Sequence, residues 1–157
     1  MEHKYQRKTL SSEEIIKEAN LLADKGFSHI LLLTGESPKR VGVDYISEAV
    51  SLISSRFDSI GIEVQPLSFK DYAQVIESGA DSLTLYQETY HKETYLQHHL
   101  RGLKRNFTNR LDAVEHGAKA GFYRINIGAL LGLYDWRYDS FALAYHLNYM
   151  IKKYWQS

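Results

Sequence analysis

The chain has 157 residues, of which 44% are hydrophobic and 24% charged, proportions that suit a globular domain and exclude intrinsic disorder. Its 19 Lys and Arg residues balance its 19 Asp and Glu residues, so it lacks the positive charge typical of proteins that bind nucleic acid or anionic lipid. It contains no cysteine, which excludes disulfides, zinc thiolates and iron–sulfur sites built from these residues alone. We expect a cytoplasmic protein with no membrane span and no nucleic-acid partner.

The first helix is predicted to begin at Ser11, which can form a capping box with Glu14. It should end at Gly26, since glycine readily takes the left-handed conformation that terminates helices. The apolar run 29–34 follows directly and is too short for a helix. Such a run is typical of a strand that is covered on both faces within a parallel sheet.

The same unit recurs along the chain. We predict further helices over residues 44–57, 68–78 and 108–119 and from about 138 to 154, with strands around 62–65, 83–86 and 125–128. Gly26, Gly79 and Gly121 each stand four residues before the first apolar residue of a strand. This regular alternation of helix and strand predicts parallel βαβ units.

Four parallel strands suit either an open doubly wound sheet or part of an eight-stranded barrel. Polar clusters follow several strands rather than a single switch point, which favours the barrel. We therefore predict an α/β fold in which residues 1–157 form parallel βαβ units, with about four strands, amounting to roughly half of a TIM-type (β/α) barrel.

Two carboxylates follow predicted strands. Glu36 ends the sequence Thr-Gly-Glu after the first strand, where a carboxylate could bind an ammonium group; the alternative is a plain loop. Glu88 lies within the sequence Tyr-Gln-Glu-Thr-Tyr-His at 86–91 and could bind the two hydroxyls of a ribose. The alternative for this segment is a polar helix start, with Thr89 as the N-cap.

The fourth strand runs into a turn with glycines at 128 and 132, where the backbone could approach a flat ring. The alternative is an ordinary glycine-rich turn. Arg110 could pair with a ligand carboxylate, or it could be a solvated helix arginine. The histidines at 91, 98 and 99 lack the i, i+4 spacing of metal ligands, so we expect no metal site.

Taken in order, these motifs resemble those of radical S-adenosylmethionine (SAM) enzymes, and most closely the tyrosine lyases of thiamine biosynthesis. The segments that carry the resemblance are residues 5–10, 34–36, 63–67, 86–91 and 128–136. The resemblance implies a parent enzyme that cleaves the Cα–Cβ bond of tyrosine to p-cresol and dehydroglycine (2-iminoacetate) for the thiazole of thiamine. It also implies SAM and a 4Fe–4S cluster as cofactors of that parent.

The resemblance assigns roles to individual residues. It implies that Glu36 meets the amino group of SAM, Glu88 the ribose hydroxyls and Arg110 the carboxylate. The adenine ring would meet the backbone of the glycine-rich turn, at Gly128, Leu130 and Leu131. It assigns no catalytic residue.

The family holds its cluster on a Cys-x-x-x-Cys-x-x-Cys loop after the first strand, and this chain has no cysteine. We expect residues 1–157 to be the second to fifth βα units of the barrel, unable to bind the cluster and inactive as a lyase in isolation. We also expect self-association through open sheet edges. The partners implied for the parent are tyrosine and a thiazole synthase.

Two alternatives stay open. One is the related tyrosine lyase of iron-hydrogenase maturation, which shares the Tyr-Gln-Glu-Thr-Tyr-His sequence; the segment 63–67 favours the thiamine branch. The other is a scaffold protein without a cluster that has kept a SAM pocket.

Overall fold

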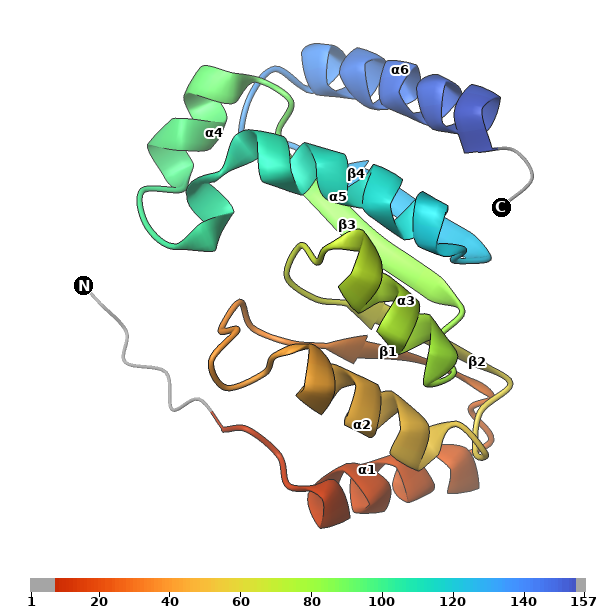
Figure 1. Ribbon diagram of the computed structural model, residues 1–157. Helices are drawn as coiled ribbons and strands as arrows, with labels where there is room; N and C mark the ends of the chain where they lie inside the picture. Colours follow the sequence, from red (N-terminus) through yellow and green to blue (C-terminus); the bar gives the residue numbers. More distant parts are fainter. Residues whose placement is uncertain (1–7, 155–157) are drawn as a thin grey trace.

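The computed structural model describes residues 8–154, so part of the first motif of the resemblance, Tyr5 to Arg7, lies outside the described residues. Helices and strands alternate along most of the chain (Figure 1). The strands are β1 (His29–Leu33), β2 (Ser59–Glu63), β3 (Ser82–Glu88) and β4 (Arg124–Ala129). The helices are α1 (Ser12–Asp24), α2 (Val43–Ile53), α3 (Phe69–Glu77), α4 (Lys92–His98), the 3-10 helix η1 (Leu103–Arg105), α5 (Phe107–Ala120) and α6 (Trp136–Tyr154).

The four strands form a single sheet in the order β1-β2-β3-β4, and every neighbouring pair is parallel. All the strands therefore end at the same edge of the sheet. This arrangement confirms the predicted α/β class and the predicted order of four parallel strands.

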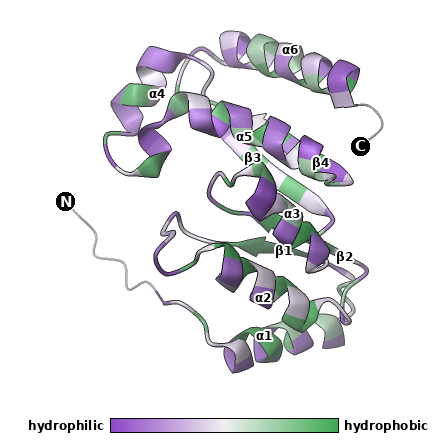
Figure 2. Ribbon diagram, viewed as in Figure 1, coloured by the Kyte–Doolittle hydropathy of each residue, from purple (hydrophilic) through white to green (hydrophobic). Residues whose placement is uncertain are grey.

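The core lies between one face of the sheet and the helices that pack on it. Alternate residues of β2 and β3, among them Ile62 and Leu83, are buried against Val50 and Val75 of the helices. Figure 2 shows each helix with hydrophobic residues on part of its surface and hydrophilic residues on the rest. Burial of these apolar faces is the main stabilising contribution to the fold.

The opposite face of the sheet is not covered in the same way. In β1 the exposed fraction is 41% at Leu31 and 65% at Leu33, so the prediction that this strand is covered on both faces was wrong for the described chain. The reason is that helices pack only on the face carrying Ile30 and Leu32. The continuous apolar run of β1 therefore belongs to a strand that the helices cover on one face only.

Several local predictions are confirmed. The predicted capping box of Ser11 with Glu14 forms at α1, and Ser68, the first residue of the helix predicted over 68–78, forms a second one with Asp71 at α3. The three glycines predicted to end helices have positive φ values; at α5, Gly121 is the C-cap with φ 103°.

Two boundaries differ from those predicted by three residues or more. Strand β2 begins at Ser59 rather than near Ile62, because its first residues pair in register with β1 starting at His29. Helix α2 ends at Ile53 rather than Phe57, although the Phe57 side chain still packs in the core.

The segment between β3 and α5 holds two short elements, of which α4 was predicted only as an alternative, a polar helix start after residue 89, and η1 was not predicted. The N-cap of α4 is His91, whose Nδ1 accepts a hydrogen bond from the Thr94 amide. The alternative that made Thr89 the N-cap was therefore wrong: Thr89 is fully buried and its hydroxyl donates to Asp139 instead. Among residues 8–154, no helix combines the length and apolar character needed to cross a membrane.

Candidate functional site

The end of β3 has an unusual backbone. Glu88 has a φ of 75°, the only positive value at a non-glycine residue within the described part of the chain. The pairing of β3 with β4 is irregular between Tyr86 and Glu88, and the amide of Leu130 donates to the Glu88 carbonyl at 2.7 Å. A positive φ is costly for a residue with a Cβ atom and is maintained only by its surroundings. The local fold therefore holds Glu88 in a fixed orientation.

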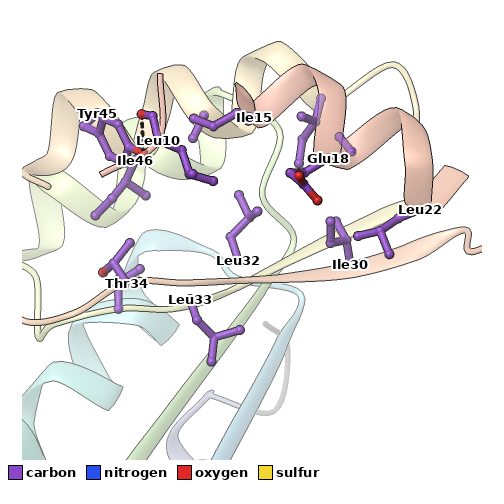
Figure 3. A pocket seen from close by; sticks show the side chains of 14 residues that line it. Leu10, Ile15, Glu18, Leu22, Ile30, Leu32, Leu33, Thr34, Tyr45 and Ile46 are labelled. Carbon is purple, nitrogen blue, oxygen red and sulfur yellow. Dashed lines mark hydrogen bonds between the residues drawn. The ribbon is translucent and has the colours of Figure 1, made fainter. Parts of the chain in front are cut away.

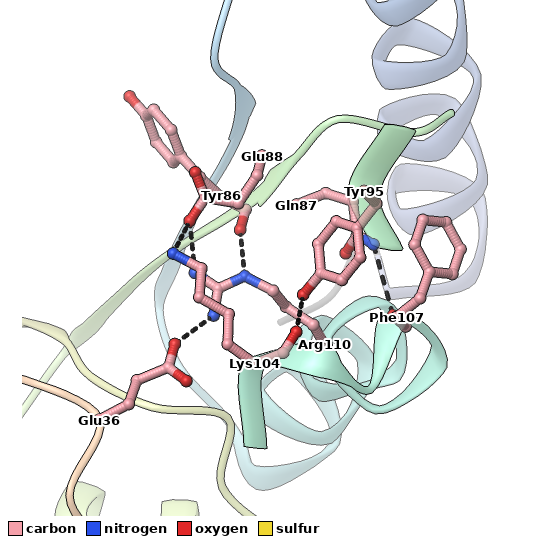
Figure 4. A network of polar contacts seen from close by, with 8 residues as sticks. All are labelled: Glu36, Tyr86, Gln87, Glu88, Tyr95, Lys104, Phe107 and Arg110. Atoms are coloured by element: carbon pink, nitrogen blue, oxygen red, sulfur yellow. Dashed lines mark hydrogen bonds and ion pairs between the residues drawn. The ribbon is translucent and has the colours of Figure 1, made fainter. Parts of the chain in front are cut away.

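The carboxylates of Glu36 and Glu88 converge on one guanidinium (Figure 4). Arg110, in the first turn of α5, donates from Nη1 to Glu36 Oε1 at 2.7 Å and from Nη2 to Glu88 Oε1 at 3.3 Å. Its Nε donates to the Tyr86 carbonyl at 2.6 Å. Lys104 forms a second ion pair with Glu88. We call Glu36, Glu88, Lys104 and Arg110 the carboxylate cluster.

The cluster is electrically balanced and partly desolvated. Glu88 and Arg110 are buried, with 6% and 7% exposure, whereas the Glu36 and Lys104 side chains are half-buried. A buried charge is tolerated only when it is paired and hydrogen-bonded. The two carboxylates and two cations meet that condition together.

Aromatic residues close one side of the cluster. The Tyr95 hydroxyl donates to the Lys104 carbonyl, and burial raises the pKa of Tyr95 to about 12. The His99 ring packs on Tyr95 with centroids 4.3 Å apart, and burial, followed by the nearby Lys104 charge, lowers the pKa of His99. Both groups are therefore neutral at pH 7.

A cleft of about 830 Å³ opens beside the carboxylate cluster, at the edge where the strands end. This volume lies in the range of small-molecule sites. Two buried oxygens in its lining, Glu36 Oε2 and Thr34 Oγ1, have no hydrogen-bond partner among the described residues. Since buried polar atoms are normally hydrogen-bonded, these atoms indicate a place for a donor from a ligand.

The glycine-rich turn after β4 reaches the same edge of the sheet. Gly128 pairs with Tyr86, and the Tyr86 ring packs closely over it, 2.9 Å from where a Cβ atom would lie. Leu130 and Leu131 are exposed. The structure thus brings Glu36, Glu88 and Arg110 into direct contact, with the turn joined to them through the backbone of Glu88.

One member of the cluster, Lys104, was not predicted from the sequence. It lies in η1, outside every motif, and an isolated lysine carries no pattern that would single it out. The described residues contain no group of three or more His, Cys, Asp or Glu side chains arranged to hold a metal ion.

A smaller cavity, of about 140 Å³, lies between α1, α2 and β1 (Figure 3). Its lining is nearly all apolar, and its labelled hydrogen bond, from Tyr45 to the Leu10 carbonyl, is made within the protein. This cavity is a gap in the core packing, without polar groups that converge on a ligand.

No protein-family model matches the chain. Among curated proteins, it is similar to 2-iminoacetate synthase of Escherichia coli (strain K12), with 42% identity over 158 aligned positions, and to that of Salmonella typhimurium (strain LT2), with 44% identity. Each alignment includes 100% of this chain and 42% of the relative. The chain thus spans about two fifths of the length of these relatives.

Solved structures give a matching result. The HydG maturase of the [FeFe]-hydrogenase superimposes with a TM-score of 0.92 at 29% identity, covering 96% of this chain and 35% of HydG. HydG from Carboxydothermus hydrogenoformans gives 0.90 at 36% identity, with the same coverage of both chains. Methylornithine synthase (PylB) shares the fold, with a TM-score of 0.78 at 24% identity. That match covers 93% of this chain and 43% of PylB. These findings confirm the resemblance predicted from the motifs: over its whole length, the chain is similar to one part of 2-iminoacetate synthase.

Proposed function

We propose that this chain forms the SAM-binding part of a radical SAM tyrosine lyase. The activity proposed for the whole enzyme is cleavage of the Cα–Cβ bond of tyrosine to p-cresol and dehydroglycine for thiamine thiazole synthesis. The observation that carries the proposal is the convergence of Glu36 and Glu88 on Arg110 beside a cleft of about 830 Å³. The identity of 42–44% to 2-iminoacetate synthase supports the choice of reaction.

The charges in the cleft suit the polar groups of SAM. In this proposal the ammonium group donates to Glu36 Oε2, the buried oxygen without a partner among the described residues. The ribose hydroxyls donate to Glu88, which Arg110 and Lys104 hold at the cleft. The adenine ring lies against the backbone of the turn at Gly128, Leu130 and Leu131.

The proposed role of Arg110 requires an exchange of partners. All three nitrogen positions of its guanidinium already donate within the protein, to Tyr86, Glu36 and Glu88. Binding of the SAM carboxylate would replace one of these contacts, most simply that to Glu36, whose negative charge the SAM ammonium would then balance.

The iron–sulfur cluster of the family does not fit the residues present. It requires cysteine thiolates, and the 157 residues contain none. We therefore propose that the isolated chain does not bind the cluster and is inactive as a lyase.

Two alternatives have specific support. The TM-scores of 0.92 and 0.90 to HydG favour the hydrogenase-maturation lyase, but the higher identity to 2-iminoacetate synthase favours the thiamine branch. The absence of cysteine would suit a scaffold that binds SAM without a cluster. A thiazole synthase partner and a cytoplasmic location stay predictions.

Isothermal titration of the chain with SAM tests the proposal. We expect saturable binding with one site, weakened about tenfold or more in Glu36→Gln and Glu88→Gln, because a hydrogen bond to a charged group contributes about 1.5–3 kcal/mol. The exposed carboxylate of Glu13, which is not among the residues that line the cleft, supplies the control Glu13→Gln, which should bind as the wild type does. Equal affinity in all four proteins would refute the assignment.

A further inference from the structure

The residues that directly follow Glu88 are tied to the start of α6 by one buried side chain. Asp139 is fully buried, with 0% exposure. Its Oδ1 accepts a hydrogen bond from the Thr89 hydroxyl at 3.0 Å and another from the Tyr90 amide at 2.8 Å. A carboxylate from a distant element therefore fixes the backbone at the end of β3.

Other contacts hold the same segment on both sides. The Tyr90 hydroxyl lies 2.9 Å from Nδ1 of His146, also on α6. On the β4 side, the Leu130 amide donates to the carbonyl of Glu88. Residue 88 is thus held through its own carbonyl by the turn that follows β4, and through the next two residues by α6.

This arrangement accounts for the unusual backbone of Glu88. A non-glycine residue with a φ of 75° relaxes to negative φ unless its neighbours prevent it. That relaxation would turn the side chain away from Arg110 and the cleft. Contacts that hold Thr89 and Tyr90 therefore also hold the Glu88 carboxylate at its place.

The two hydrogen bonds that Asp139 accepts indicate a role other than filling space in the core. A buried carboxylate is costly, and Asp139 Oδ2 has no hydrogen-bond partner among the described residues. We infer that Asp139 is a positioning residue, which holds Glu88 in the left-handed conformation so that its carboxylate faces the cleft. The inference rests on the proposed function only in taking Glu88 as a SAM ligand.

The test compares Asp139→Ala with Asp139→Asn, which keeps an oxygen able to accept both hydrogen bonds. The first readout is the intraresidue amide–Hα NOE of Glu88, which is strong when φ is positive. The others are hydrogen exchange at the Tyr90 amide and the SAM dissociation constant. We expect Asp139→Ala to weaken the NOE, speed exchange at least about tenfold and raise the dissociation constant about tenfold. Asp139→Asn should restore all three.

Met150 supplies the matched control, since it is buried on the same helix. Met150→Ala should lower the melting temperature and leave the NOE and the dissociation constant unchanged. If Asp139→Ala does not fold, Thr89→Val removes one of the two donors and should shift the same readouts by about threefold.

Unchanged NOE and exchange in the Asp139→Ala or Thr89→Val protein would overturn the inference, as would equal effects of Met150→Ala. If no protein in the series binds SAM but the NOE responds as expected, the positioning role stands and the proposed function fails. The two failures are therefore distinguishable.

Discussion

Two carboxylates and two cations share the carboxylate cluster, and each depends on the others. Glu88 and Arg110 are withdrawn from water, so each loses hydration that only a close opposite charge can offset. Arg110 bridges both acids, whereas Lys104 contacts Glu88. Removing Arg110 therefore leaves Glu36 without its ion pair and Glu88 with a single partner.

We predict that Arg110→Met lowers the free energy of unfolding by about 3 kcal/mol, the cost of leaving buried carboxylates without their partner. Urea denaturation at pH 7 measures this change. The control is Arg101→Met at the exposed rim of the same cleft, where a loss within about 0.5 kcal/mol is expected. A loss below about 1 kcal/mol in Arg110→Met would show that the buried pairs contribute little.

The sequence allowed Glu36 and Glu88 to be chosen, because both lie in recognisable motifs at the ends of apolar strands, whereas Arg110 was assigned from the resemblance and from its place near the start of a predicted helix. It could not reveal the left-handed backbone of Glu88. That conformation depends on contacts with Leu130 and with the residues held by Asp139, which are distant in sequence.

At the scale of elements, α6 is the helix with the most exposed apolar side chains. One of its ties to α5 is Glu115, whose carboxylate accepts from the Tyr154 hydroxyl at 3.1 Å and from Lys153 at 3.1 Å. Burial alone would raise the pKa of Glu115, but these bonds, with those from Tyr149 and Lys119, lower it to about 2.

We predict that the contacts of Glu115 make the free energy of unfolding depend on pH. The pKa of Glu115 is lower in the folded than in the unfolded chain, where it is about 4.3. Its stabilising contribution is therefore complete above about pH 4.5 and is lost as the pH falls towards 2. Between pH 6 and pH 2.5 the free energy of unfolding of the wild type should fall by about 1 kcal/mol more than that of Glu115→Gln. This value allows for solvent screening, because the side chains that bind Glu115 are partly exposed.

Urea titrations at the two pH values measure this difference. Asp112→Asn, on the exposed side of the same helix, is the matched control and should follow the wild type. Parallel pH profiles for the wild type and Glu115→Gln would contradict the assignment.

Helix starts and the strand order were predictable because capping boxes and apolar runs are local signals. The predictions failed where the outcome depends on distant contacts. Strand β2 extends back to Ser59 because β1 offers pairing partners. Helix α4 begins at Lys92 with His91 as its N-cap, and the Thr89 hydroxyl donates to Asp139 instead of capping the helix.

At the scale of the whole molecule, the sheet has one covered face and one open face. Leu31, Leu33 and Tyr86 are exposed on the open face, and β1 and β4 each have an unpaired edge. Open strand edges beside apolar side chains favour association.

We predict that the chain self-associates in solution and that Leu33→Lys weakens this association at least about tenfold, since it places a charge on the open face. Sedimentation velocity over a concentration series measures the effect. Phe141→Lys, at the 75% exposed Phe141 of α6, is the control and should associate as the wild type does. A monomeric wild type, or equal effects of both variants, would contradict the prediction.

The central claim is that the edge where the strands end binds SAM, and chemical-shift mapping on the ¹⁵N-labelled chain tests it most directly. During a SAM titration, we predict saturable shifts at the amides of Gly35, Glu36, Glu88 and residues 128–131, with little change in α1. The groove between α5 and α6, lined by Phe141, Tyr145 and other aromatic residues, offers an internal comparison. An absence of saturable shifts, or shifts confined to that groove, would contradict the account.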